Sequence, residues 1–174
     1  YGEEGTWNLE MRDCYDRADL DPVLSYAELG DETEWKLAAF PVFFEGQPSL
    51  RKGAVPVRRL AVTGADGKQQ ERLVTTVFDI LAASLAIDRG HGGDVASGYE
   101  DARAYATPAW QEAITGVPAE DMIRVAREFA DNAERSGGRS MIIMGAGVNH
   151  WYNNDVTYRA MISLTTLCGC QGVS

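Results

Sequence analysis

The sequence predicts an α/β fold in which helices pack on a short, mainly parallel sheet. Three observations support this prediction. The apolar run at 140–144 does not alternate with polar residues, which is typical of a strand buried on both faces. An amphipathic helix pattern precedes this run, and a glycine-rich loop and a further helix pattern follow it. Upstream, two β-rich runs flank an Asp66-Gly67 turn and predict a β-hairpin.

The expected hairpin has strands at 55–62 and 72–78. Pro56 places the first strand at an edge or at a strand start, because proline cannot donate to a sheet ladder. Asp79 is a suitable N-cap for a helix at 80–88. The glycine-rich stretch 90–93 then interrupts the chain.

Two helices with clear boundary signals follow. Thr107 is an N-cap residue and Pro108 occupies the first helical position, so a short helix is expected from there to about Gly116. Pro118 opens a second helix, whose apolar residues at 122, 125, 126, 129 and 133 share one face. Gly137 and Gly138 are expected to end this helix, because glycine readily adopts the left-handed conformation that closes a helix.

The first third of the chain differs from the rest. Residues 1–50 hold 12 acidic and 3 basic side chains and show no sustained period, with short extended pieces such as 40–44. We therefore expect two parts: an irregular acidic segment at 1–54 and an α/β part at 55–174. The usual reading of such a charge run is a solvated surface segment.

Composition excludes several classes of function. The net charge of −10 comes without a basic stripe, so nucleic-acid binding is not expected. The sequence has neither an apolar run of membrane-spanning length nor a visible signal peptide. It starts with Tyr1 rather than Met, and the chain is expected to be a fragment of a longer protein. Its three cysteines, Cys14, Cys168 and Cys170, are too few for a four-cysteine cluster, and the latter two are expected to be half-buried at a tight turn.

The candidate site is the loop between the 140–144 strand and a last helix at 155–167, which Asn153 or Asn154 would cap. Gly145, Gly147, Asn149 and His150 are the candidate cofactor-binding residues. Glycines at such a position let backbone N–H groups approach a phosphate, and Asn and His add hydrogen-bonding reach. The dinucleotide pattern GxGxxG fails at His150, so a glycine turn without a ligand remains open.

Several motifs resemble one enzyme family. Residues 107–117 read TPAWQEAITGV, which is similar to a stretch of molybdopterin oxidoreductases. Residues 145–152 read GAGVNHWY and residues 168–170 read CGC, and both resemble the alpha subunit of membrane-bound respiratory nitrate reductase. The resemblance is strong over 55–172 and patchy before that, and it identifies the chain as an internal fragment of such a catalytic subunit.

The resemblance implies a function for the parent subunit. It would carry bis(molybdopterin guanine dinucleotide) molybdenum and a 4Fe-4S cluster, and reduce nitrate to nitrite in anaerobic respiration with electrons from quinol. Its partners would be an iron–sulfur beta subunit and a membrane haem gamma subunit, at the cytoplasmic face of the membrane. His150 would stand near the pterin or the molybdenum. The motifs for cluster and molybdenum ligation are not in this chain, so the fragment should bind no metal and be inactive alone.

Two alternatives of other classes remain. The glycine loop after a buried strand is also compatible with a free-standing Rossmann-like nucleotide-binding module. The acidic segment 1–54 is compatible with the docking arm of a non-catalytic interaction domain. A fragment without the rest of its subunit could also self-associate through the surface normally covered.

Overall fold

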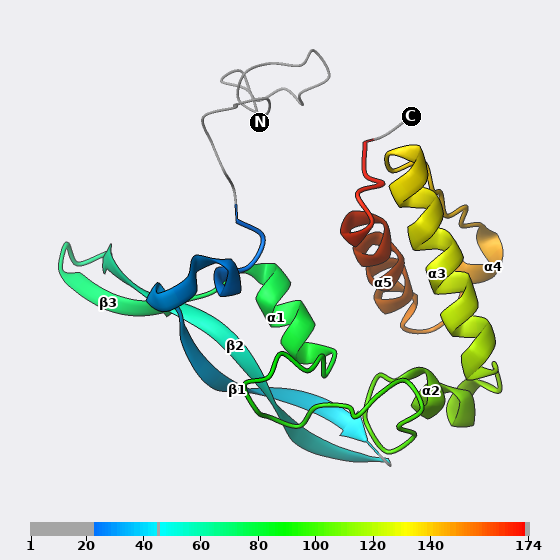
Figure 1. Cartoon of the computed structure of the whole chain (residues 1–174), viewed down its shortest axis with the longest axis horizontal. Coiled ribbons are helices and arrows are strands. Elements are labelled where there is room, and N and C mark those ends of the chain that lie inside the picture. Colours follow the sequence, from blue (N-terminus) through cyan, green and yellow to red (C-terminus); the bar gives the residue numbers. More distant parts are fainter. Residues whose placement is uncertain (1–22, 45, 173–174) are drawn as a thin grey trace. The chain divides into compact units, whose positions relative to one another are not determined.

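A computed structural model describes residues 23–44 and 46–172 of the chain, and the chain divides into two compact units between Ala96 and Ser97 (Figure 1). The predicted mixture of helices and strands is confirmed. The part boundary expected between 54 and 55 falls within a strand, whereas the structure divides after residue 96. Of the segment expected to be irregular, residues 1–22 lie outside the described residues.

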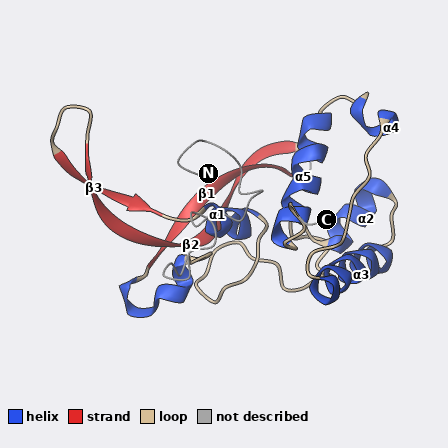
Figure 2. Cartoon of the chain, turned by 90° about the horizontal axis from the view of Figure 1, so that it is seen from above, coloured by secondary structure: helices blue, strands red, loops and turns tan. Residues whose placement is uncertain are grey.

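The first unit is a three-stranded meander with one helix. A 3-10 helix, η1 (Tyr26–Glu32), precedes β1 (Glu34–Phe44), β2 (Gln47–Thr63), β3 (Gln69–Val74) and helix α1 (Val77–Ser84). The strands, red in Figure 2, pair antiparallel in the order β1-β2-β3. The expectation of a mainly parallel sheet is therefore wrong for the described strands, because short turns join them and such turns permit only antiparallel neighbours.

Residues 34–44 and 47–54 are strand rather than irregular. β1 pairs with β2 along its whole length, from Glu34 opposite Val57 to Phe44 opposite Gln47. The prediction from sequence failed here because prolines at 41 and 48 interrupt the local pattern, although proline is tolerated at sheet edges. The hairpin expected downstream is confirmed, since 58–63 of β2 pair with β3 around a turn closed by the Gly64 N–H donating to the Lys68 carbonyl at 2.8 Å.

Thr76, not Asp79, is the N-cap of α1. The Thr76 hydroxyl accepts the Asp79 backbone N–H at 3.0 Å, which satisfies one of the orphan donors of the first turn. The helix therefore starts three residues earlier than expected and ends at Ser84. The Asp79 side chain is fully buried and accepts hydrogen bonds from other segments instead.

The core of the first unit lies between α1 and one face of the β1–β2 hairpin. Val55, Val57 and Ala83 form its buried centre, and Ala38 and Phe40 pack against them. The helix backbone approaches β2 closely at Gly53, where an added Cβ would lie 2.7 Å from the Ala83 carbonyl oxygen. Glycine is thus required there by contact rather than by backbone conformation.

The second unit is helical. It contains α2 (Pro108–Thr115), α3 (Ala119–Ser136), α4 (Ala146–Asn149) and α5 (Asn154–Leu167). The expected boundaries of the first two are confirmed: the Thr107 hydroxyl accepts the Trp110 N–H at 3.1 Å, and Gly116 and Gly137 end α2 and α3 with φ of 75° and 67°. Within the described ranges, no helix is both long and apolar enough to cross a membrane.

The segment 140–144 is not paired as a strand. It follows α3 without a sheet partner among the described residues. The expected burial on both faces is also wrong, because Met141 is 76% exposed and Ile143 is 83% exposed, whereas Ile142 and Met144 are half-buried. A strand is buried on both faces only when neighbouring strands and covering helices are present, and the described residues supply packing on one side alone.

Candidate functional site

The predicted site lies at the end of the segment that follows α3. Two hydrogen bonds hold the start of this segment along the helix: the Asn132 side-chain amide donates to the Ser140 hydroxyl at 2.8 Å, and that hydroxyl donates to the Phe129 carbonyl at 3.0 Å. The chain then runs through 141–144 to Gly145, the N-cap of α4, whose φ of −140° is extended. The end of α3 thereby fixes where the loop begins.

All four predicted cofactor-binding residues fall within this short turn. Gly145 and Gly147 stand at its start, Asn149 is the last residue of α4, and His150 is its C-cap. The Val148 N–H donates to the Gly145 carbonyl at 3.0 Å, which closes the turn. All four residues are solvent-exposed, so the structure brings them together on an open loop and not in an enclosed pocket.

Gly145 and Gly147 have no local reason to be glycine. Among the glycines that the structure describes, every other one either has a positive φ or would bring a Cβ within 4 Å of a neighbouring atom. At these two positions φ is not positive and an added Cβ would meet nothing within 4 Å. Glycine is also favoured where a ligand must come close to the backbone. This explanation is compatible with Gly145 and Gly147 if a group from outside the chain approaches the loop.

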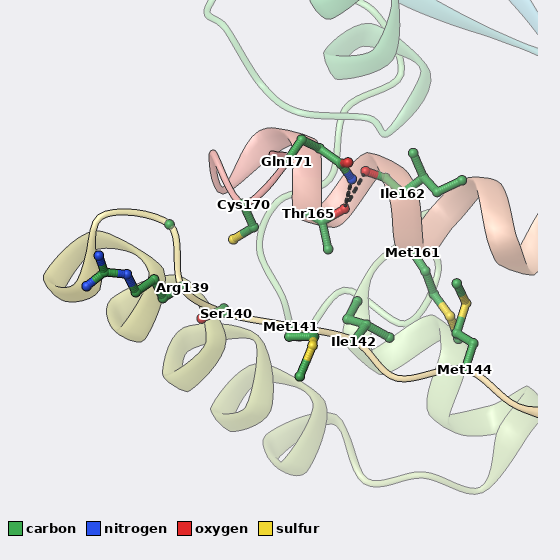
Figure 3. A pocket seen from close by; sticks show the side chains of 11 residues that line it. Arg139, Ser140, Met141, Ile142, Met144, Met161, Ile162, Thr165, Cys170 and Gln171 are labelled. Carbon is green, nitrogen blue, oxygen red and sulfur yellow. Dashed lines mark hydrogen bonds between the residues drawn. The ribbon is translucent and has the colours of Figure 1, made fainter. Parts of the chain in front are cut away.

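A separate cavity of about 420 Å³ lies between the 139–144 segment and α5 (Figure 3). Its wall includes the thioethers of Met141, Met144 and Met161, together with Cys170 and Arg139. None of the four predicted residues lines it, and sequence reasoning missed it. The residue in the sequence that could have indicated this cavity is Met161, which lies one helical turn before Thr165 on the face of α5 that lines the cavity.

The two described cysteines occupy the tight turn that ends α5, as expected. Cys168 is the C-cap, Gly169 follows with a φ of 65°, and both thiols are half-buried. The Cys170 sulfur lies 3.5 Å from the Cys168 carbonyl oxygen. Among the described residues, no group of three or more His, Cys, Asp or Glu side chains is placed to hold a metal ion.

The most strongly polar cluster belongs to the first unit and was not predicted. The buried Asp79 carboxylate accepts from the Ser25 hydroxyl at 2.5 Å, the Tyr26 N–H at 2.9 Å, the Thr76 hydroxyl at 2.8 Å and Arg89 Nη1 at 2.6 Å. Burial by itself raises the pKa of Asp79, but the hydrogen bonds, those from Ser25 and Arg89 foremost, outweigh it and hold the pKa below its ordinary value.

This cluster, which we call the Asp79 latch, joins distant segments. Arg89 also donates to the Ser25 hydroxyl at 2.7 Å, and its guanidinium lies 5.0 Å from the Trp35 ring centroid. His91 stacks on Trp35 with ring centroids 3.7 Å apart. Each oxygen of the Asp79 carboxylate thus accepts two hydrogen bonds from residues of the same unit, which makes the latch a structural feature rather than a reactive one.

Comparison with known proteins identifies relatives along almost the whole chain. No family model matches the chain. It is 44% identical to the respiratory nitrate reductase 1 alpha chain of Escherichia coli over 100% of its own length, and 40% identical to the nitrate reductase alpha chain of Bacillus subtilis over 97%. A perchlorate reductase alpha subunit of Dechloromonas aromatica is 35% identical over 87% of the chain. The chain spans only 13–15% of the length of these relatives.

Proposed function

Because this chain belongs to the family of the nitrate reductase alpha chains, of which it represents a part, we propose that it forms one wall of a molybdenum-cofactor site in a respiratory nitrate reductase. The loop from Gly145 to His150 is the proposed contact. The observation that carries this assignment is the pair of glycines, Gly145 and Gly147, that neither backbone conformation nor packing within the chain requires.

The residues of this loop fit a pterin–nucleotide cofactor in kind. Gly145 and Gly147 would present backbone N–H groups to a phosphate, and the first-turn N–H groups of a helix have no intrahelical partner. The Asn149 amide would read the edge of a base or pterin, and the exposed His150 ring would donate a hydrogen bond. The bis(molybdopterin guanine dinucleotide) molybdenum would supply the oxygen-atom transfer that reduces nitrate to nitrite.

The proposal assigns no metal ligand to this chain. Its part is to bind and orient the organic portion of the cofactor, while residues of the rest of the alpha subunit would hold the molybdenum and a 4Fe-4S cluster. An iron–sulfur beta subunit and a haem-containing membrane subunit would deliver electrons from quinol at the cytoplasmic face of the membrane. The open loop supports this division, since its four polar or glycine positions are exposed and enclose nothing by themselves.

Nitrate is the substrate that most relatives' names indicate, and perchlorate is named for one. Both are oxyanions that lose an oxygen atom on reduction. The loop contacts proposed here would serve the cofactor, so they would be shared by reductases of either substrate. Selectivity between the two oxyanions would depend on other residues of the subunit.

The experiment compares loop variants in the full alpha subunit that carries these residues. The double variant Gly145→Ala/Gly147→Ala should lower the molybdenum content per subunit, measured by elemental analysis, and lower nitrate reduction in proportion. In the isolated chain, the same double variant should leave the urea midpoint unchanged, because the added Cβ atoms meet nothing.

Two further variants sharpen the test. His150→Ala should reduce nitrate turnover, with a smaller loss of molybdenum than the glycine variant. Ala130→Ser, at an exposed position of α3, should change neither quantity and serves as the matched control. Full molybdenum content in the double glycine variant would refute the proposed contact, whereas molybdenum bound at one equivalent by the isolated chain would refute the division of the site between this part and the rest.

A further inference from the structure

One face of the β1–β2 hairpin carries a strip of exposed apolar side chains. Leu37 is 55% exposed, Phe43 is 66% exposed and Leu50 is 71% exposed. The pairing register places Phe43 opposite Pro48 and Pro41 opposite Leu50. Because directly opposed residues of an antiparallel pair share a face, these five residues lie on the same side of the hairpin. We call this set, Leu37, Pro41, Phe43, Pro48 and Leu50, the hairpin strip.

The strip lies on the side away from the core. Side chains alternate along a strand, so Leu37 and Phe43 point to the face opposite that of Ala38 and Phe40. Ala38 and Phe40 pack on the buried centre of the unit, whereas α1 leaves the strip uncovered. The base of this second face is covered within the unit itself, since Ala54, opposite Leu37, is 6% exposed and Pro56 is fully buried. The uncovered part of the face is the hairpin strip, which runs from Leu37 toward the hairpin tip.

The strip is long and carries little charge. From Leu37 to Phe43 the strand rises by about 20 Å at the usual spacing of 3.4 Å per residue. Of the described residues that the register places on this face along that length, Lys52, opposite Ala39, carries the one charge. An apolar surface of this extent is typical of a protein contact rather than of an exposed face.

The chemistry of the strip favours docking by its face and not by its edge. Pro41 and Pro48 remove backbone donors near the hairpin tip, and this disfavours the addition of a further strand there. The apolar side chains, in contrast, fit an apolar partner surface that fills the gaps between Leu37, Phe43 and Leu50.

The length of the relatives indicates the occupant. The chain corresponds to 14% of the respiratory nitrate reductase 1 alpha chain of Escherichia coli, so that subunit is about seven times as long as the stretch it shares with this chain. We propose that the hairpin strip docks on an apolar surface formed by another part of the same alpha polypeptide. This inference rests on the proposed function only in taking the chain as part of such a subunit.

Photo-crosslinking in the assembled enzyme tests the occupant. Phe43→p-benzoylphenylalanine in the full alpha subunit should, on irradiation, join to a peptide of the same polypeptide, identified by mass spectrometry. The matched control places the same amino acid at Lys68, in the exposed turn between β2 and β3, where no crosslink is expected. Crosslinks from position 43 to a second alpha chain or to another subunit, or no crosslink at all, would overturn the proposal.

A second measurement does not depend on the probe. The double variant Phe43→Asp/Leu50→Asp should lower the yield of assembled alpha subunit about tenfold, because two large apolar side chains are no longer buried in the contact. Gln70→Asp on β3 should leave the yield unchanged, and an equal yield for both variants would contradict the docking. Nitrate reduction by the same preparations separates the two proposals. Active enzyme whose crosslink lies outside the alpha chain would refute the docking alone. An intrachain crosslink in protein that does not reduce nitrate would refute the proposed function alone.

Discussion

Removal of Arg89 tests the Asp79 latch most directly. The Arg89→Ala variant takes away the single cation that contacts the Asp79 carboxylate among the described residues, and it leaves that carboxylate fully buried. It also removes the second donor to the Ser25 hydroxyl and the guanidinium over Trp35. The remaining donors, from Ser25, Tyr26 and Thr76, are neutral and cannot balance the charge.

The structure sets the expected magnitude. Breaking a buried ion pair by removing one partner costs about 3–5 kcal/mol, because an uncompensated charge stays behind. The Arg89 side chain keeps 17% of its surface exposed, so water partly screens the pair. We therefore expect the lower end, about 3 kcal/mol of unfolding free energy lost by the first unit. That is a large share of the stability of a small domain.

The assay is urea unfolding of the isolated chain, followed by the fluorescence of Trp35 after the other three tryptophans are replaced by Phe. Trp35 reports on the latch because His91 and Arg89 both contact its ring. Arg72→Ala, which removes an exposed arginine of β3, is the control and should shift the midpoint little. Arg89→Lys should recover part of the loss, and it remains informative if Arg89→Ala does not fold. A shift for Arg89→Ala no larger than that of Arg72→Ala would refute the reasoning.

Three further outcomes follow from the first unit. The pKa of Asp79 is lowered in the folded state, so the stability contributed by its carboxylate is complete above the unfolded-state pKa and is lost as the pH falls through the folded-state pKa. Urea midpoints measured from pH 7 down to 2 should show this loss. The Asp79→Asn variant should lack it. Hydrogen bonds from Arg59 lower the pKa of the exposed Glu34 to about 2, and in Arg59→Gln an NMR titration should find it well above that value, whereas an unchanged titration would contradict the pairing. Gly53→Ala places a Cβ 2.7 Å from the Ala83 carbonyl oxygen and should lower the unfolding free energy by about 1–3 kcal/mol in the same urea assay, and an unchanged midpoint would contradict the close approach.

The local signals of the sequence were sufficient for the ends of α2 and α3 in the second unit. Thr107 with Pro108, and Gly137 after a regular apolar period, define helix ends through interactions within a few residues, so their positions could be predicted. The strand predicted at 140–144 depended on neighbours that the described residues do not contain, and its burial was therefore wrong.

The first unit was harder because its structure depends on long-range pairing. β1 is stabilised by its hydrogen-bonded pairing with β2, and residues 34–44 show no local hydrophobic period that would predict a strand. The latch likewise unites Ser25, Asp79 and Arg89, which are up to 64 residues apart in sequence. For the candidate site, sequence indicated the loop from Gly145 to His150, but only the three-dimensional surroundings showed that its glycines lack a structural reason.

The meander also has a consequence for the order in which the protein is made. Each strand pairs with the one just before it through a short turn, so the sheet needs no residue beyond the first 74 to form its ladders. Contacts of such small sequence separation form early, and a domain can fold while later parts of the chain are still being synthesised. Until its partner surface has folded, the hairpin strip would stay exposed, and during that interval it is a natural target for chaperones that bind apolar chain segments.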